Sequence, residues 1–290
     1  MERPFGHTVT LQFSLAQSWL RLGPVWAVIA GALATGSLGW RVEDIVRLVT
    51  VWILVDPLLG TIWSLWVDQQ SDEASTAPLQ PAPSQQGFML PYTQPGSRAE
   101  RFVLGVRSYQ DEWQSGYWPV SRERWVTLGV PIFLALLIAF FLHPIIFWLT
   151  LLGIGCIFIS GISSVSTNAL SVHKAWLQAT VQFLLPWGIG TLAWGSLTSL
   201  GLTIGFCYWL SYIGGLGVFS GRQNAEYLLL GGQLIAVGVM VASGFILGSL
   251  LICLTLFIQW RLYQQSDQLL RTIQYFLIGS VLLAGFALGI

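Results

Sequence analysis

The chain has 290 residues, of which 54% are hydrophobic and 9% are charged, with 13 basic and 13 acidic side chains and no net charge. Soluble domains carry about 25% charged residues, so this composition excludes an ordinary water-soluble fold. The lack of net positive charge argues against nucleic acid as a partner, because nothing would neutralise its phosphates. The sequence therefore predicts an all-α, polytopic integral membrane protein that is surrounded by the lipid bilayer.

Nine segments are long and apolar enough to be expected as membrane spans, since a span needs about 20 mainly apolar residues. Almost no polar residue separates the fifth segment from the sixth or the seventh from the eighth, so eight spans are the alternative. Residues 1–21 are amphipathic, and we expect them to lie at the membrane interface rather than to form a cleavable signal peptide. In chain order the segments are 23–40, 45–67, 125–142, 144–162, 175–197, 198–219, 227–242, 244–260 and 273–290.

The distribution of basic residues predicts the orientation. With nine spans, 11 of the 13 basic residues fall on the side that contains the N-terminus. Because the more basic side is normally cytoplasmic, the N-terminus is predicted to be cytoplasmic and the C-terminus to lie on the other side. Eight spans would break this asymmetry, so the basic residues favour nine.

One long polar stretch, residues 68–124, interrupts an otherwise single helical domain that covers residues 1–290. On the predicted topology this stretch is a cytoplasmic insertion between the second and third spans. Its first half is rich in Pro, Gln and Ser, which is typical of irregular structure. Its second half has apolar residues at near-helical spacing, which predicts a short amphipathic helix on the membrane face or against a partner.

Two carboxylates, Asp68 and Asp72, stand four residues apart where the second span leaves the membrane. If the helix continues for one more turn, both project from the same face. Mg²⁺ prefers oxygen ligands and usually bridges to substrate phosphates. The pair is therefore a candidate magnesium site, and the alternative interpretation is a solvated helix end.

A third carboxylate, Asp56, lies near the middle of the second span and is followed by Pro57. A carboxylate at that depth is energetically costly and normally faces the bundle interior, where it has a partner. Two interpretations stay open. Asp56 is either a ligand-binding or proton-handling group in an internal cavity, or a protonated group that bonds backbone carbonyls freed by Pro57.

Histidine and tryptophan residues suggest where a flat ring would bind. His143 lies at the turn between the third and fourth spans, on the non-cytoplasmic side, and is either a ligand for a chlorophyll magnesium or a plain interfacial histidine. Six tryptophans lie deeper in the predicted spans. They either line a cavity for a flat ring or an isoprenoid, or pack against another subunit. This group is Trp52, Trp63, Trp148, Trp187, Trp194 and Trp209.

Several segments resemble motifs of the UbiA superfamily of membrane prenyltransferases, in particular its chlorophyll and bacteriochlorophyll synthases. The helix end SLWVDQQSD is similar to the family's acidic motif NDxxDxxxD and keeps Asp68 and Asp72, although Ser64 and Leu65 replace its Asn and first Asp. The segment PVWAVIAGALATG is similar to the synthases' first helix, and LLPWGIGT resembles a Leu-Pro-Trp segment of the synthases. The resemblance extends over nearly the whole chain and implies nine helices with a cavity on the cytoplasmic side.

The basic residues of a diphosphate site are implied by the same resemblance. YWPVSRERW is similar to the family's RPxPSGR-type loop and keeps Pro119 and Arg122, with Gly116 in place of the leading Arg. SVSTNALSVHKAWLQ resembles the segment before the fifth helix and places Lys174 on the family's diphosphate-contacting lysine, but it lacks the family's Tyr and both of its Pro residues.

The second acidic motif of the family is missing. The family carries it between helices 6 and 7, where it holds the Mg²⁺ that neutralises the departing diphosphate. No Asp or Glu occurs between Glu123 and Glu226, and the corresponding connection, GGLGVFSGRQNAEY, offers only Arg222, Gln223, Asn224 and Glu226. The sequence therefore favours a homologue that has lost its metal chemistry.

Two functions follow from the resemblance. The first is a non-catalytic accessory or scaffolding subunit of a photosynthetic pigment–protein membrane complex, with (bacterio)chlorophyll, a quinone or an isoprenoid lipid as a bound molecule. The second is an active prenyltransferase, in which Asp68 and Asp72 bind Mg²⁺ while Arg122, Lys174 and Arg222 hold the diphosphate of the isoprenyl donor. Its acceptor would be chlorophyllide-like or a quinone precursor. Either function implies a multi-pass protein of a bacterial inner or photosynthetic membrane. A transporter is less favoured, because the chain has no inverted repeat and a single mid-membrane charge.

Overall fold

The described part of the chain is entirely helical. The computed structural model describes residues 23–39, 41–68, 118–164, 171–220, 222, 224–263 and 270–290, and no strand occurs among them. The amphipathic segments expected within 1–21 and within the second half of 68–124 lie outside these residues, apart from the last residues of the insertion. The all-α prediction is confirmed for the described residues.

Within the described ranges, the helical elements join into nine continuous rods. Two rods contain π-helical turns: residues 42–68 are made of four elements and residues 171–194 of three. The elements of the first five rods are α1 (Gly23–Leu33), α2 (Val42–Ile53), η3 (Leu54–Leu58), α3 (Leu59–Trp63), η4 (Ser64–Asp68), α6 (Trp118–Leu142), α7 (Pro144–Ser164), α8 (Ser171–Ala179), η6 (Thr180–Leu184) and α9 (Leu185–Trp194). The remaining rods are α10 (Ser199–Phe219), α11 (Ala225–Ala242), α12 (Ile246–Tyr263) and α13 (Leu270–Gly289).

Both boundaries that the sequence left open are real breaks. The Thr198 hydroxyl accepts a hydrogen bond of 3.0 Å from the Gly201 backbone N–H and caps the start of α10, as expected for a Thr at this position. The break between α11 and α12 contains Gly244, whose φ of 89° belongs to the left-handed region that glycine adopts without strain.

Two helix boundaries differ from the expected ones. The first segment was predicted to continue to residue 40, but α1 ends at Leu33 in a turn that contains Gly36 with a φ of 65°. Residues 118–124 were placed in the polar insertion and are instead the first turns of α6. Arg122 therefore lies on a helix rather than in a loop, which is a correction of the sequence-based assignment.

Among the residues that the structure describes, four helices are long and apolar enough to cross a membrane: Val42–Val67, Pro144–Gly161, Ser199–Val218 and Ala225–Ala242. Four shorter apolar helices accompany them: Pro24–Leu33, Thr127–Leu142, Ile246–Arg261 and Gln274–Gly289. Large apolar side chains are exposed along α6, α7, α11 and α12, for example Phe141 (78%) and Leu247 (75%). Exposed apolar surface of this extent is typical of a lipid or protein contact.

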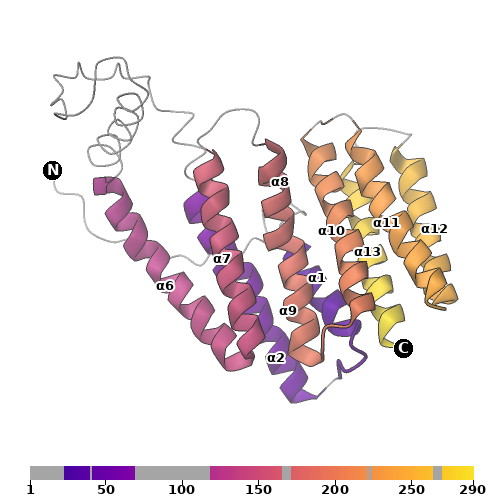
Figure 1. The fold of residues 1–290 in the computed structure, drawn as a ribbon, viewed down its shortest axis with the longest axis horizontal. Coiled ribbons are helices and arrows are strands. Elements are labelled where there is room, and N and C mark those ends of the chain that lie inside the picture. Colours follow the sequence, from indigo (N-terminus) through magenta and orange to yellow (C-terminus); the bar gives the residue numbers. More distant parts are fainter. Residues whose placement is uncertain are drawn as a thin grey trace, which may run out of the picture.

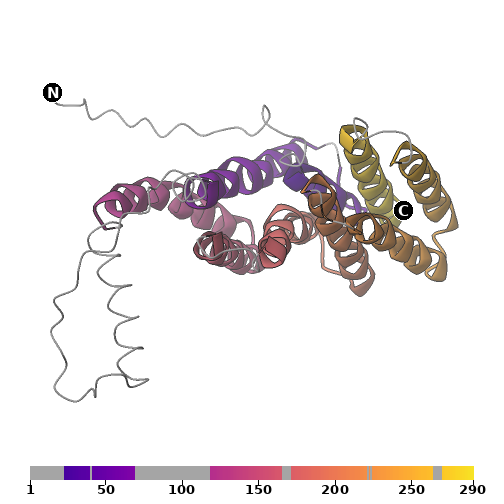
Figure 2. The same cartoon turned by 90° about the horizontal axis from the view of Figure 1, so that it is seen from above.

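The rods stand roughly side by side in an elongated array. Figure 1 shows α6 at one end of the array and α12 at the other, with α7, the rod of residues 171–194, α10 and α11 between them. The view from above in Figure 2 shows the same elongation, with α13 beside α12. Contacts place α1 against α9 on one side and α13 on the other.

Buried apolar side chains form three clusters. One joins α1, α8, η6 and α9 to the four C-terminal helices α10–α13. Another joins α1, α2 and η3 to α6, α7 and α9, and the third lies where α3 and η4 meet α6, α7 and η6. Since α1 and α9 belong to both of the first two clusters, they connect the N-terminal and C-terminal halves.

Glycines allow α1 to approach its neighbours at backbone distance. A methyl group added at Gly190 of α9 would overlap the carbonyl oxygen of Val28 in α1, and one at Gly285 of α13 would overlap the carbonyl oxygen of Ala30. Small residues at helix interfaces permit such close packing, which drives helix association in membranes. The short helix α1 therefore combines close backbone contacts with side chains buried in two clusters.

We expect Gly190→Ala to destabilise the protein by about 1–3 kcal/mol, because the added methyl group forces α1 and α9 apart. The matched control is Gly188→Ala in the same helix, where the nearest atom to the new methyl group is Leu149 Cδ1 at 3.6 Å. That control should be neutral or stabilising by up to about 1 kcal/mol, since Ala is the better helix former. Thermal unfolding in detergent, followed by circular dichroism, compares the two. Equal stability of both variants would contradict this account of the α1 contacts.

Candidate functional site

Four of the residues implied by the family resemblance lie at the same end of the helical array. Asp68 is the last residue of η4, Arg122 is in the first turns of α6, Lys174 is in the first turn of α8, and Arg222 follows the end of α10. Because successive rods run in opposite directions, these termini are all found at the upper end in Figure 1. The side chains of Asp68, Arg122 and Lys174, and the whole of Asp72, lie outside the described residues. This charged end is the part of the fold to which a diphosphate-binding site was assigned.

The connection between α10 and α11 is short, since α10 ends at Phe219 and α11 begins at Ala225. The Arg222 backbone N–H donates to the Gly217 carbonyl at 2.9 Å, and Asn224 adopts a left-handed φ of 65°. A methyl group added at Gly217 would lie 2.7 Å from the Ala225 Cβ atom, so the two helices meet directly at the connection. The connection therefore leaves no extended loop to carry a second acidic motif, and the first carboxylate after it is Glu226.

The described residues contain no cluster of metal ligands. No group of three or more His, Cys, Asp or Glu side chains comes together in this part of the chain. Metal ions such as Mg²⁺ are usually held by several oxygen ligands, including carboxylates. The described residues of α10 and α11 therefore contain no complete set of acidic metal ligands. The side chains of Asp68 and Asp72 lie outside the described residues.

A polar strip leads from the charged end into the protein along the rod of residues 171–194. Gln178 lies one helical turn after Lys174, and its Nε2 donates to the Gln182 Oε1 atom at 3.2 Å. The Tyr212 hydroxyl of α10 donates to the same Gln182 oxygen at 3.1 Å. The bond from Tyr212 connects η6 to α10. The strip ends at a group of aromatic rings.

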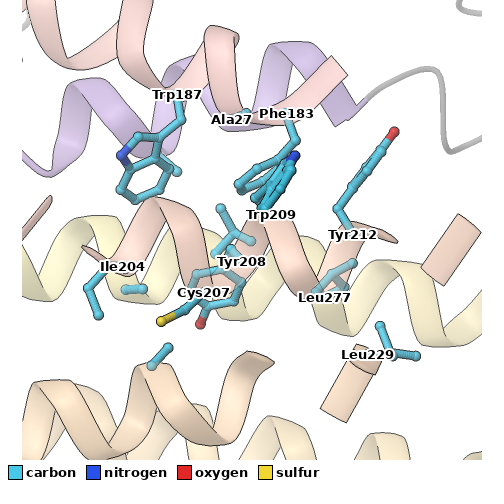
Figure 3. Packing of buried hydrophobic residues seen from close by; sticks show 14 of the residues in the cluster. Ala27, Phe183, Trp187, Ile204, Cys207, Tyr208, Trp209, Tyr212, Leu229 and Leu277 are labelled. Carbon is cyan, nitrogen blue, oxygen red and sulfur yellow. The ribbon is translucent and has the colours of Figure 1, made fainter. Parts of the chain in front are cut away.

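The aromatic rings fill the space between α9 and α10, as Figure 3 shows. Phe183 stacks on Tyr212 at a centroid distance of 5.7 Å and on Trp187 at 6.3 Å. The Trp187 indole N–H donates to the Gly201 carbonyl at 3.2 Å, and the Trp209 indole N–H donates to the Thr180 hydroxyl at 3.2 Å. The polar edges of these two tryptophans are therefore bound within the chain.

The six tryptophans that the sequence placed deep in the protein differ in burial, and Trp52 is half-buried. Trp63, Trp187, Trp194 and Trp209 are buried in the core of this chain. Trp148, by contrast, is 65% exposed, and it is in contact with Phe147. The buried group belongs to the internal packing, and Trp148 on α7 remains available to lipid or to another subunit.

Asp56 is 3% exposed and lies in the π-helical turn η3. Its Oδ2 atom accepts a hydrogen bond of 3.4 Å from the Trp52 indole N–H. Pro57 has no N–H, and the helix widens here so that the Leu59 N–H bonds the Leu54 carbonyl five residues earlier. The Thr61 hydroxyl donates to the Pro57 carbonyl. The partner of Asp56 is thus an indole one turn away, and a threonine satisfies the carbonyl of Pro57.

His143 lies between α6 and α7 and is exposed, as the sequence predicts. Its Nδ1 atom accepts a hydrogen bond of 3.2 Å from the Ile145 backbone N–H. In a neutral imidazole, one ring nitrogen accepts while the other carries the proton, so this bond places the proton on Nε2. Ligation of a magnesium ion by Nε2 would therefore require the bond to Ile145 to break.

Two polar contacts between distant parts of the chain escaped the sequence analysis. At the end opposite the charged residues, the Trp194 indole N–H donates to Asp44 Oδ1 at 3.2 Å, and Arg47 donates to the Ala193 carbonyl at 2.9 Å. Arg47 thus binds a free carbonyl at the end of α9. Between 146 and 150 residues separate the partners, and no local pattern in the sequence indicates such a pairing.

A buried amide pair joins two of the C-terminal helices. Gln233 of α11 donates from Nε2 to the Gln259 Oε1 atom of α12 at 2.9 Å, and both residues are fully buried. Gln274 of α13 is 9% exposed, and its Oε1 atom has no hydrogen-bond partner. Polar residues inside apolar helices are the signal that sequence analysis could have used to find this group.

Comparison of the chain with family models, with curated proteins and with solved structures finds no match in any of the three. The interpretation of the site therefore depends on the geometry described above and on the sequence motifs.

We expect Asp56→Asn to change the free energy of unfolding by less than about 1 kcal/mol, because the amide oxygen can still accept from the Trp52 indole. Asp56→Leu has the same branched shape but is larger and has no acceptor, and it should cost about 1–3 kcal/mol. Chemical unfolding in mixed micelles compares the three proteins. If Asp56→Asn fails to fold while Asp56→Leu folds normally, the hydrogen-bonding role of Asp56 is wrong.

Proposed function

We propose that this chain is a multi-pass membrane protein with a UbiA-like bundle of nine spans and a cytoplasmic N-terminus, and that it does not catalyse prenyl transfer. On this proposal it is an accessory subunit of a photosynthetic pigment–protein membrane complex. The observation that carries the proposal is the short α10–α11 connection, because residues 124–225 contain no carboxylate and Glu226 is the first one after it. The similarity to synthase motifs supports the architecture and the photosynthetic context.

The missing carboxylates matter because prenyl transfer releases diphosphate, which carries about three negative charges. Metal ions and cations that meet this developing charge usually provide the largest share of transition-state stabilisation. Removal of one metal site should raise the barrier by several kcal/mol, and each 1.4 kcal/mol corresponds to about a tenfold loss in rate. Arg222 supplies one positive charge near the α10–α11 connection, but a guanidinium group cannot bind a metal ion.

An accessory role is supported by how the chain distributes its apolar surface. Aromatic side chains fill the interior between α9 and α10, whereas Phe133, Phe140 and Phe141 on α6 and Trp148 on α7 are exposed. A helical bundle with such a surface can bury it against lipid, a pigment, a quinone or a neighbouring membrane subunit. The proposed contact with other subunits lies on this α6–α7 face.

A second candidate is an active prenyltransferase, which is favoured by the position of Asp68, Arg122, Lys174 and Arg222 at one end of the array. In that case Asp68 and Asp72 would bind Mg²⁺, and the three basic side chains would hold the diphosphate. An isoprenyl group would pass to a chlorophyllide-like or quinone-precursor acceptor. The two candidates differ in their dependence on Mg²⁺ and on Asp68.

A prenyl-transfer assay distinguishes them. The purified protein is incubated with geranylgeranyl or phytyl diphosphate, chlorophyllide and Mg²⁺, and the esterified product is quantified beside a chlorophyll synthase as positive control. We expect turnover at least about a thousandfold below that control, because several kcal/mol of stabilisation are missing. Robust Mg²⁺-dependent turnover that disappears in Asp68→Ala would refute the non-catalytic proposal and support the second candidate.

The accessory role has its own test in the native membrane. Purification of the tagged chain in mild detergent should yield an absorption spectrum with pigment bands and defined subunits at fixed stoichiometry. Exchange of exposed apolar residues on the α6–α7 face, as in Phe141→Ser with Trp148→Ser, should release these subunits. The matching exchange Leu247→Ser with Leu250→Ser on α12 should not. A colourless, monomeric wild-type protein would contradict the accessory role.

A further inference from the structure

A groove of about 350 Å³ lies on the outer face of the two helices α11 and α12. It is open to the surroundings because Leu234, Phe257 and Trp260 are 58%, 55% and 48% exposed. Its volume falls in the range of about 300–1,000 Å³ that is typical of small-molecule sites. The residues lining it are Leu230, Leu234, Cys253, Leu256, Phe257 and Trp260.

The groove is apolar along its length and ends at charged residues. Its lining residues on α12 extend from Cys253 to Trp260, which corresponds to about 10 Å at a helical rise of 1.5 Å per residue. Arg261 follows Trp260 directly, is exposed, and has its guanidinium carbon 6.0 Å from the centroid of the Phe257 ring. The positive charge is therefore held over a ring that lines the groove.

A negative charge lies on the facing helix at the same end. Glu226 is one helical turn before Leu230 on α11, so both residues are on the same face of that helix. Within the described residues, neither Glu226 nor Arg261 forms an ion pair. The mouth of the groove thus combines one positive and one negative side chain with an apolar channel below them.

We propose that this groove binds one phospholipid whose headgroup contains both a phosphate and a primary ammonium group, as in phosphatidylethanolamine. An acyl chain occupies the apolar groove, the phosphate accepts from the Arg261 guanidinium, and the ammonium group meets the Glu226 carboxylate. Arg and carboxylate or phosphate groups form strong charge-assisted hydrogen bonds. The headgroup end of the groove lies at the same end of the array as Arg222, but lipid binding there does not depend on the proposed function.

The charge pattern selects this headgroup over the alternatives. A lipid with a net negative headgroup, such as phosphatidylglycerol, would gain from Arg261 but be repelled by Glu226. Phosphatidylcholine carries a quaternary ammonium group that cannot donate a hydrogen bond to a carboxylate. A pure isoprenoid hydrocarbon has no group for either charge, although it would fit the apolar channel.

The test is native mass spectrometry of the purified full chain in detergent, titrated with phosphatidylethanolamine, phosphatidylglycerol and phosphatidylcholine of identical acyl chains. We expect one phosphatidylethanolamine per chain, bound about fivefold more tightly than either other lipid, which is the factor expected for one charge contact near a membrane surface. Arg261→Gln should weaken all three lipids by about fivefold. Glu226→Gln should remove the preference for phosphatidylethanolamine and leave binding of phosphatidylcholine unchanged.

A steric variant tests the groove itself. Leu234→Trp fills the channel and should abolish stoichiometric binding of every lipid. The matched control is Leu254→Trp, since Leu254 is 57% exposed on α12 but does not line the groove. Arg41→Gln, at the other end of the array, controls for a general loss of positive charge. Circular dichroism and thermal unfolding establish that each variant is folded.

Three results would overturn the proposal. One is the lack of a preference for phosphatidylethanolamine that depends on Glu226, seen either as equal affinity of the wild-type chain for the three lipids or as a preference that persists in Glu226→Gln. Another is retention of the bound lipid by Leu234→Trp while that variant is folded. The third is a mass corresponding to two chains that becomes one chain in Leu234→Trp, because the groove would then be an interface between copies of the protein.

Discussion

Close contact of α1 with α9 and α13 holds the two halves of this protein together. α1 is short, with 11 residues, and contributes to both of the clusters that fill the N-terminal and C-terminal halves. Glycines on the neighbouring helices let its backbone approach theirs directly. In a membrane, burial of apolar side chains gains little over lipid, so packing at this distance is a main source of helix association. The positions of the charged end and of the aromatic rings therefore depend on it.

Three polar contacts inside the array show how buried side chains are satisfied within the described part of the chain. The Tyr208 hydroxyl bonds Ser280 on α13 at 2.6 Å, Asp56 accepts from Trp52, and Gln233 bonds Gln259. Each bond satisfies groups that would otherwise be costly to bury, and two of the three join different helices. The bonds between helices fix their register, which apolar packing alone leaves less specific. A one-turn slip of α10 against α13, for example, would break the bond from Tyr208 to Ser280.

Apart from Asp56, the charged residues of the described ranges lie near the two ends of the array. The non-catalytic proposal concerns the end where Asp68, Arg122, Lys174 and Arg222 are found and where Glu226 follows the short α10–α11 connection. The phospholipid site concerns the outer face of α11 and α12, where one arginine and one glutamate stand above an apolar groove. Binding of a phospholipid between α11 and α12 neither requires nor excludes prenyl transfer by this chain.

The sequence by itself determined the all-helical class and the order of the helices, because a backbone in lipid must satisfy its own hydrogen bonds and thus forms helices wherever the chain is apolar. The breaks before Ser199 and Ile246 were left open by the sequence and decided by the structure. The sequence also placed Asp56 inside a helix and His143 at a turn. Only the tertiary structure decided the partner of Asp56, the proton position on His143, which tryptophans are buried, and the pairing of Asp44 with Trp194. These features depend on side-chain directions and on neighbours up to 150 residues away, which hydropathy and spacing do not encode.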